Sequence, residues 1–314
     1  MVNISSQVEK NNEIFSRFPQ DSCPIIIGYG SGFKYQKGYG EGDRPQKDFL
    51  IGVKNTWLFH AKNLNLNPLD YSSLIKLFGT DFAEYIQNIS PYIYYNPYVK
   101  VGDDTIKYGI ISTEKMISDL LNWETLYIAG RLHKPVEVFR TTDKFNEAFE
   151  INLSYALKVA LILLGENFTE QELYETITGI SYMGDSRKGY FENPQKVQNI
   201  VKGNFKEFQE LYKNTIQKNT EIEKKGSNTD NFNQDKNPIK IEQIHQKGYL
   251  PDNLLKGIPD WVTDFDILEK FIISRINDIV KSSSFEQTIK GFITAGFSKS
   301  LHYIFEKNKK SRKR

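Results

Sequence analysis

Two short apolar segments near the N-terminus constrain the fold most. The first, CPIIIGY at 23–29, is rich in β-branched residues and runs into a Gly-Ser-Gly turn at 30–32. The second, DFLIGV at 48–53, is apolar behind a single aspartate. Short apolar runs of this kind, bounded by turn residues, are typical of buried β-strands. We therefore expect two strands that are connected through a glycine-rich and charge-rich loop.

Strand and helix patterns alternate through the rest of the first 145 residues. Segments 57–67, 70–89 and 112–123 predict helices, and the last begins with a Ser-Thr cap and an acid in its first turn. Segment 92–112 predicts two strands around a Gly-Asp-Asp turn. Alternation of this kind indicates a mixed α/β domain over residues 1–145.

The remaining sequence predicts mainly helices. Apolar periodicity runs through 143–181 and again through 193–216, and NFTEQEL within the first of these resembles a capped helix start. Segment 217–238 is almost entirely polar, so we expect a flexible insert. A further helix is expected within 261–296. We therefore divide the chain into a helical domain at 146–215 and a region at 216–314 that holds the insert and a helical, basic end.

Composition excludes several classes of protein. The formal net charge is +2, which gives no global signal for nucleic-acid binding, and the single Cys23 excludes internal disulfides and a cysteine zinc site. No segment reaches the roughly 18 apolar residues that span a bilayer. The first twenty residues lack an apolar core and contain Glu9 and Glu13, which is atypical of targeting peptides. These features predict a soluble, unexported protein.

The glycine turn and the aspartate that follows it predict a phosphate site. Backbone N–H groups of a Gly-Ser-Gly turn and the hydroxyl of Ser31 suit phosphate oxygens, although such turns also serve as ordinary connections. Asp48 stands where nucleotidyltransferases place a carboxylate that holds Mg²⁺ beside a triphosphate. The usual second acid, two residues later, is Leu50 here. Three acids are candidates for the missing ligand: Glu41, Asp43 and Asp185.

Polar residues inside otherwise apolar elements are further candidates. His60, Lys62 and Asn63 lie close together in one predicted helix, where His60 and Asn63 share a face. A lone histidine on a helix is also commonly structural. Lys107 lies in an apolar strand, on the face opposite Ile106 and Tyr108. A lysine on a buried face requires an anionic partner such as phosphate, whereas one at a strand end can reach water instead.

Two later turns gather charged residues. Arg131, His133 and Lys134 follow a glycine and precede a proline, so the turn suits either an anion or an ordinary solvated loop. Asp185 and Arg187 lie beside a second glycine turn, where an internal ion pair is the simpler explanation.

Taken in order, these segments resemble the mitochondrial-type phosphatidate cytidylyltransferase family, the soluble CDP-diacylglycerol synthases also described as translocator assembly and maintenance proteins. The run DLLNWETLYIAGRLHKPV at 119–136 is long enough to be specific. Further matching segments are YGSG at 29–32, DF at 48–49, HAKNL at 60–64, Asn67, YS at 71–72, IKYGIIS at 106–112, SYMGDSR at 181–187, VQNIVKGNFKEFQELY at 197–212 and IKGFITAG at 289–296. The match is weakest over the first twenty residues, the polar insert and the stretch after it.

The resemblance implies a fold and a reaction. The expected fold is a nucleotidyltransferase-type α/β domain with a mixed sheet, followed by a helical, winged-helix-like domain and a C-terminal membrane-associating region. The expected reaction converts CTP and phosphatidic acid to CDP-diacylglycerol and pyrophosphate, with Mg²⁺ or a similar divalent cation. CDP-diacylglycerol serves phosphatidylglycerol and cardiolipin synthesis. The family also has an apolar residue at the position of Leu50.

The resemblance also implies roles for individual residues. Asp48 and Lys107 are expected to be catalytic, with Asp48 as the metal ligand, and Asp185 and Arg187 to bind the substrate. The residues expected to bind the nucleotide are Gly30, Ser31, Gly32, His60, Lys62, Asn63, Arg131 and Lys134.

The C-terminal sequence suits a lipid substrate. Residues 307–314 include six basic side chains in eight, which suits an anionic membrane surface but is also typical of a solvated tail. We expect a cytoplasmic enzyme on the inner membrane surface, or one on the matrix side if the chain is eukaryotic. No nucleic-acid partner is expected. The alternatives are a nucleotidyltransferase with another acceptor and a non-catalytic peripheral membrane protein.

Overall fold

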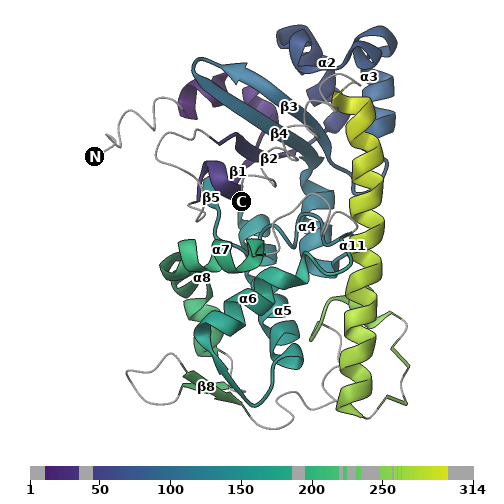
Figure 1. Cartoon of the computed structure of the whole chain (residues 1–314). Coiled ribbons are helices and arrows are strands. Elements are labelled where there is room, and N and C mark those ends of the chain that lie inside the picture. Colours follow the sequence, from purple (N-terminus) through teal and green to yellow (C-terminus); the bar gives the residue numbers. More distant parts are fainter. Residues whose placement is uncertain are drawn as a thin grey trace.

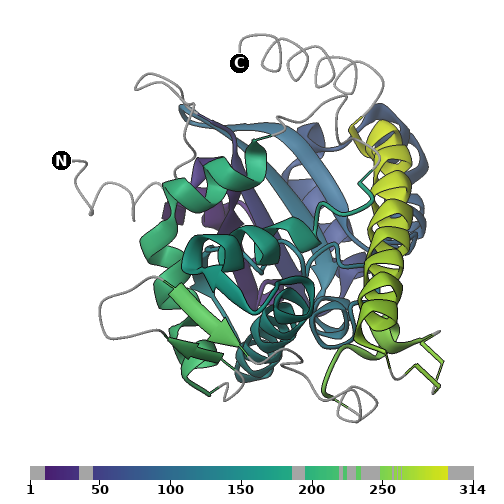
Figure 2. The ribbon, with the colours of Figure 1, turned by 60° about the horizontal axis from the view of Figure 1, so that its bottom comes forward.

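A mixed sheet with its helices and a second, mainly helical group form the molecule, and the long helix α11 (Phe265–Ala295) runs along both (Figures 1 and 2). This computed structural model describes residues 11–34, 45–185, 195–218, 222–224, 231–234, 248–256, 258–259, 261–262 and 264–295. Among these residues, no helix is long and apolar enough to cross a membrane.

The sheet has five strands in the order β3-β4-β2-β1-β5. The strands are β1 (Ile25–Tyr29), β2 (Lys47–Val53), β3 (Tyr94–Val101), β4 (Asp104–Ser112) and β5 (Glu137–Arg140). β2 and β4 are parallel, whereas the other neighbours are antiparallel. The expected α/β class and its first four strands are confirmed. β5 was not anticipated, because this short edge strand is held mainly by its pairing with β1.

Side-chain caps begin the helices of this first group. The helices are α2 (Thr56–Leu66), α3 (Ser73–Gln87) and α4 (Thr113–Asn122). The hydroxyl of Ser112 accepts a hydrogen bond from the Lys115 N–H, which confirms the predicted helix start. α3 bends at Gly79, whose φ of 78° interrupts the helical backbone.

The second group contains five helices and a small sheet among the described residues. The helices are α5 (Asp143–Leu163), α6 (Glu170–Ile180), α7 (Lys196–Gly203), α8 (Phe205–Lys218) and α10 (Asp252–Leu255). The helical pattern expected over 193–216 is thus divided into two helices, at Asn204. α6 begins with a capping box between Thr169 and Glu172, as its sequence predicted.

Part of the polar insert forms strands, which the sequence did not predict. β6 (Asn167–Thr169), β8 (Asn231–Gln234) and β7 (Ile222–Lys224) form a three-stranded sheet in that order. Phe168 lies opposite Phe232 in the register, and their rings stack with centroids 5.8 Å apart. Burial of this aromatic pair stabilises the pairing of the otherwise polar segment with β6.

The two faces of the five-stranded sheet cover two separate cores. Ile25, Ile27 and Leu50 point into a core that continues through α4 to α8 and α11. The neighbouring strand residues Ile26 and Phe49 point to the other face of the sheet, into a second core under α2 and α3. Because the first core is shared by both groups, it crosses the domain boundary expected near residue 145.

Candidate active site

The register of the sheet places three polar side chains in one row. Tyr29 pairs with Asp48 across β1 and β2, and Asp48 pairs with Lys107 across β2 and β4. Directly paired residues on neighbouring strands point to the same face, so Asp48 and Lys107 lie side by side. The predicted face of Lys107 is confirmed, because Ile106 and Tyr108 are buried in the opposite core.

The glycine turn lies directly beside Asp48. Gly30–Gly32 form a short 3₁₀ turn in which the Gly30 carbonyl accepts hydrogen bonds from the N–H groups of Phe33 and Lys34, at 3.0 and 2.9 Å. Gly30 has a φ of +75°, and a Cβ added there would lie 3.9 Å from Asp48 Oδ2. A Cβ on Gly32 would lie 2.5 Å from the Gln46 carbonyl oxygen, so only glycine fits this approach.

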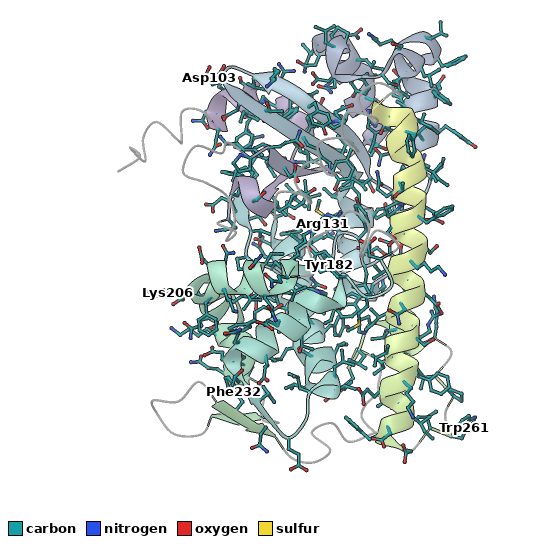
Figure 3. The ribbon with its side chains drawn as sticks, in the orientation of Figure 1. Asp103, Arg131, Tyr182, Lys206, Phe232 and Trp261 are labelled. Carbon is teal, nitrogen blue, oxygen red and sulfur yellow. The ribbon has the colours of Figure 1, made fainter. Side chains whose placement is uncertain are left out.

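A cavity of about 330 Å³ opens over this row of residues, between the sheet and the helical group. Figure 3 shows Arg131 and Tyr182 in this region. The cavity combines five cationic side chains with two carboxylates. Its polar lining includes Tyr29, Ser31, Lys34, Asp48, Lys107, Tyr127, Arg131, Lys134, Ser181, Tyr182, Asp185, Lys196, Ser283 and Ser284. Most of the predicted site residues that the structure describes are therefore brought together.

Tyrosine rings hold two of these cations. The Lys107 ammonium lies 4.1 Å from the centroid of the Tyr95 ring, and the Arg131 guanidinium carbon lies 3.6 Å from that of Tyr127. The hydroxyl oxygens of Tyr29 and Tyr95 are 3.2 Å apart, and burial raises the pKa of both phenols. Tyr29 and Tyr95 are therefore neutral near pH 7. The Tyr95 and Tyr127 rings position the two cations through cation–π contacts.

A buried carboxylate organises the loop that carries Tyr127 and Arg131. Asp119 Oδ1 accepts hydrogen bonds from the Thr125 N–H and hydroxyl and from the Leu126 N–H, at 2.6–3.1 Å. Its Oδ2 accepts two further bonds, from the N–H groups of residues 128 and 129, at 2.9 and 3.0 Å. Sequence reasoning did not single out Asp119. In the sequence, Asp119 could have been recognised as a single acid on the apolar face of a short predicted helix.

Lys134 and Asp185 reach the cavity from the helical side. The Lys134 ammonium donates hydrogen bonds to the Gly130 carbonyl and, at 2.9 Å, to the Ser181 hydroxyl. Asp185 follows Gly184, where an added Cβ would lie 2.4 Å from the backbone oxygen of Asn277 on α11. This close packing fixes the turn on α11. Arg187, Glu41 and Asp43 lie outside the described residues.

His60, Lys62 and Asn63 do not line the cavity. The ring nitrogens of His60 contact the Tyr71 hydroxyl at 3.0 Å and Gln87 Oε1 at 3.1 Å, and burial lowers its pKa to about 4. Asn63 donates to the same Tyr71 hydroxyl, and Lys62 is exposed. The helix face that His60 and Asn63 share packs into the core on the opposite side of the sheet. Their position does not support direct contact with a nucleotide.

His133 is also part of the core. Its Nε2 lies 3.2 Å from Asn152 Oδ1, and burial lowers its pKa to about 3. His133 therefore does not add a cation to the anion site considered for this turn. Arg131 and Lys134, which are three residues apart on this turn, line the cavity, whereas His133 between them is neutral and buried.

The oxygen donors of the cavity fit a divalent cation that is shared with a substrate. Asp48 and Asp185 supply carboxylates and Ser31 a hydroxyl, and Mg²⁺ commonly takes one or two carboxylates together with substrate phosphates. Within the part of the chain that the structure describes, no group of three or more acidic, histidine or cysteine side chains forms a metal site. Leu50, at the position of the usual second acid, is fully buried in the core.

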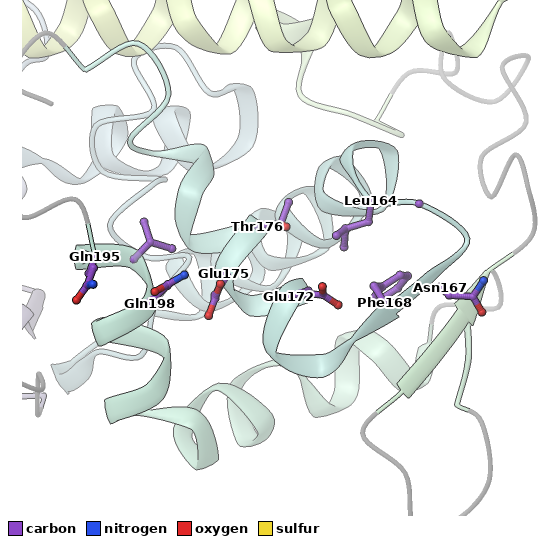
Figure 4. Close-up of a pocket in the computed structure, with 10 residues that line it drawn as sticks. Leu164, Asn167, Phe168, Glu172, Glu175, Thr176, Gln195 and Gln198 are labelled. Carbon is purple, nitrogen blue, oxygen red and sulfur yellow. The ribbon is translucent and has the colours of Figure 1, made fainter. Parts of the chain in front are cut away.

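A second and larger cavity, of about 770 Å³, lies between β6, α6 and α7 (Figure 4). Its charged lining residues are Glu172, which caps α6, and Glu175, which accepts a hydrogen bond from Gln171. It contains none of the predicted site residues. The smaller cavity therefore has the chemistry of an active site, although the other has the greater volume.

Cations and two carboxylates over the central strands of a mixed sheet define a class of α/β protein that binds a phosphate-bearing ligand. Comparison with known sequences identifies the family. Residues 11–310 match the family described as “Phosphatidate cytidylyltransferase, mitochondrial”, and the chain belongs to this family.

Individual relatives agree with this assignment. Proteins named mitochondrial phosphatidate cytidylyltransferase are similar to the chain in Schizosaccharomyces pombe (36% identity, covering 93% of this chain and 81% of the relative) and in Saccharomyces cerevisiae (36%, covering 100% and 74%). The relative in Xenopus laevis is 37% identical, with 94% of this chain and 92% of the relative covered. The family that the sequence resembles is therefore confirmed.

Proposed function

We propose that this chain is a phosphatidate cytidylyltransferase, which transfers CMP from CTP to phosphatidic acid and releases pyrophosphate. The observation that carries the proposal is the pairing of Asp48 with Lys107 beside the glycine turn, with Arg131 lining the same cavity. The arrangement provides one carboxylate for a metal and several cations for phosphates. The named activity of the relatives supports this choice of substrates.

The reaction requires positioning and neutralisation of charge. A phosphate oxygen of phosphatidic acid attacks the α-phosphorus of CTP, and the bond from that phosphorus to the bridging oxygen of the β-phosphate breaks. We assign Lys107, Arg131 and Lys134 to phosphate oxygens, and Gly30 and Ser31 to the triphosphate. Phosphate monoesters are largely ionised near pH 7, so no strong general base is needed. Fixed cations in the cavity lower the barrier because they stabilise charge as it moves to pyrophosphate.

Asp48 would hold Mg²⁺ or a similar cation, with Asp185 as a nearby second carboxylate. The cation would neutralise the triphosphate and polarise the reacting phosphoryl group. Asp48→Asn should lower kcat/KM by about 100-fold or more, the scale typical of one lost electrostatic contact in an active site. Asp103→Asn, which changes an exposed acid in the turn between β3 and β4, is the matched control. Full activity in Asp48→Asn would contradict the metal assignment.

The function itself is tested by following the α-phosphate of labelled CTP into lipid. We expect label in the organic phase only when Mg²⁺ and vesicles with phosphatidic acid are both present. Turnover without lipid would indicate a nucleotidyltransferase with another acceptor. Nucleotide binding without any turnover would indicate a non-catalytic membrane protein.

Finer properties of the enzyme are part of this proposal. The sheet β6-β8-β7 beside α6 to α8 supports a winged-helix-like second domain. The basic residues 307–314 lie outside the described residues, and we propose that they add attraction to anionic lipid. Their deletion should weaken sedimentation with anionic vesicles. The relatives are named mitochondrial, which supports a mitochondrial location. We propose in addition that the enzyme acts on the matrix side of the inner membrane and that its product serves phosphatidylglycerol and cardiolipin synthesis.

A further inference from the structure

Helices α2 and α3 expose an unusual concentration of large apolar side chains. Of the fifteen exposed large apolar residues in the described chain, eight lie between residues 57 and 85. These eight, called here the α2–α3 patch, are Trp57, Leu58, Leu66, Leu69, Leu74, Leu77, Phe78 and Tyr85. Single exposed apolar residues are ordinary, but a cluster of this size marks a contact surface.

The bend in α3 presents the patch outward. Leu77 and Phe78 directly precede Gly79 and are 75% and 60% exposed. No atom lies within 4 Å of a Cβ added at Gly79, so the bend stands clear of the rest of the described structure. The Phe82 ring contacts Phe78 on one side and Tyr85 on the other, with centroids 5.4 and 6.4 Å apart. An aromatic row therefore continues across the bend.

The inner face of α3 is separate from this surface. Ile75, Ala83 and Ile86 are buried in the core under the sheet and hold the helix in place. The outward leucines and aromatics contribute little to that core. Exposed apolar side chains lower solubility, and these do not stabilise the core. We therefore expect this surface to contact a partner.

The charges around the patch favour an anionic partner. Lys54, Lys62 and Lys76 are exposed on the same segment. The exposed acid Asp81 accepts a hydrogen bond from Trp57 Nε1 at 2.8 Å. Apolar and aromatic side chains with lysines among them suit the boundary between lipid headgroups and acyl chains.

The patch lies at the end of the molecule where α11 contacts α3. Figure 1 shows α2 and α3 beside the C-terminal end of α11. The ammonium of Lys290 on α11 donates hydrogen bonds to the carbonyls of Gln87, at 3.4 Å, and Ile89, at 2.6 Å. Ser284, which lines the catalytic cavity, is six residues earlier on the same helix, or about 9 Å along its axis. The patch is thus linked to the cavity wall through less than two helical turns.

We infer that the α2–α3 patch docks the enzyme on an anionic bilayer, with Leu77 and Phe78 entering the acyl boundary. The inference rests on the proposed function, because phosphatidic acid is a lipid that the enzyme must reach at a membrane surface. A second copy of the chain would also cover apolar residues, but the exposed lysines repel their own copies and attract anionic lipid. Docking through this surface holds the bilayer near the C-terminal end of α11, less than two helical turns from Ser284 in the cavity wall.

The test compares vesicle binding by full-length variants. Leu77→Ser/Phe78→Ser should bind vesicles of phosphatidylcholine and phosphatidylglycerol at least about tenfold more weakly, since each removed side chain contributes roughly that factor or more when buried. Ile151→Ser/Ile267→Ser, which removes two exposed apolar side chains outside the patch, should bind within about twofold of the parent chain. Equal binding by the patch variant and the parent would overturn the inference.

A second readout reports the surface directly. Leu77→Cys, labelled with a polarity-sensitive fluorophore, should shift its emission to shorter wavelength on anionic vesicles, whereas the same label on Ile267→Cys should not. The native Cys23 is buried, so labelling is selective. If the Leu77 label is unchanged on vesicles, or if the patch variant only converts a dimer to a monomer, the inference fails.

Activity separates this inference from the proposed function. On phosphatidic acid in vesicles the patch variant should lose activity in parallel with binding. On short-chain phosphatidic acid dissolved as monomers it should match the parent, because the patch residues do not line the cavity. Absence of activity in the parent with either substrate would refute the proposed function, while the binding and fluorescence results would still decide on the docking surface.

Discussion

Replacing Asp119 with asparagine tests whether a single carboxylate shapes the active-site loop. Asp119 is buried and accepts five hydrogen bonds, four of them from backbone N–H groups. Asparagine keeps the size of the side chain but offers one accepting oxygen. If that oxygen takes the place of Oδ1, the amide NH₂ faces the N–H groups of Ile128 and Ala129, donor against donor.

The magnitude follows from the bonds that are lost. Two hydrogen bonds to a charged acceptor are removed, at about 1.5–3 kcal/mol each, so the free energy of unfolding should fall by roughly 3–6 kcal/mol. The three remaining bonds also lose their charge assistance. Because the whole stability of a domain is about 5–15 kcal/mol, this is a large fraction of the total. The loop carries Tyr127 and Arg131, so kcat/KM should fall as well.

The assay is urea unfolding at pH 7, followed by kinetics with CTP at a temperature where the variant is folded. Glu114→Gln changes an exposed acid on the same helix and is the control, with an expected loss below about 1 kcal/mol. A loss below about 1 kcal/mol in Asp119→Asn would refute the reasoning, since the carboxylate would then not be holding the loop.

Three further predictions follow from the site and the core. Gly32→Ala should destabilise the protein and weaken CTP binding, because its Cβ meets backbone at 2.5 Å; an unchanged Kd measured by calorimetry would contradict this. Tyr95→Phe retains the ring beside Lys107 and should lower kcat/KM less than about tenfold, whereas Tyr95→Leu should lower it much further; equal kinetics would exclude the cation–π role. His60 and His133 have pKa values of about 4 and 3, below the 6.5 of an unfolded histidine, so the stability they contribute is present above pH 6.5 and is lost as pH falls through 6.5 toward those values. The free energy of unfolding should fall by about 2 kcal/mol for each histidine between pH 7 and 5. His60→Gln should therefore reduce the pH dependence of the free energy measured by urea unfolding over that range.

Local patterns predicted the elements well because they depend on neighbours in the sequence. The β-branched runs at 25–29 and 48–53 form strands, and the Ser112 cap begins α4. Alternation along β4 placed Lys107 on the correct face, since successive residues of a strand point to opposite sides. The long motif at 119–136 also identified the family before any geometry was known.

Residue types alone misplaced some of the polar groups. A histidine is equally compatible with a cavity and a core, and the sequence near His60 and His133 does not distinguish these. Both are neutral and buried, and each ring has a nitrogen in contact with a residue that is distant in the sequence, Gln87 for His60 and Asn152 for His133. Likewise, the polar segment at 231–234 forms a strand because Phe232 packs against Phe168.

The sequence by itself thus determined the family, the α/β class, the main strands and the face of β4 on which Lys107 lies. Only the tertiary structure decided that Asp48 and Lys107 are neighbours, that Tyr95 and Asp119 support the site, and that α2 and α3 expose an apolar surface. The physical reason is the range of the interactions. Propensity, capping and alternation act over a few residues, whereas strand register, burial and cation–π contacts depend on segments that meet only after the chain has folded.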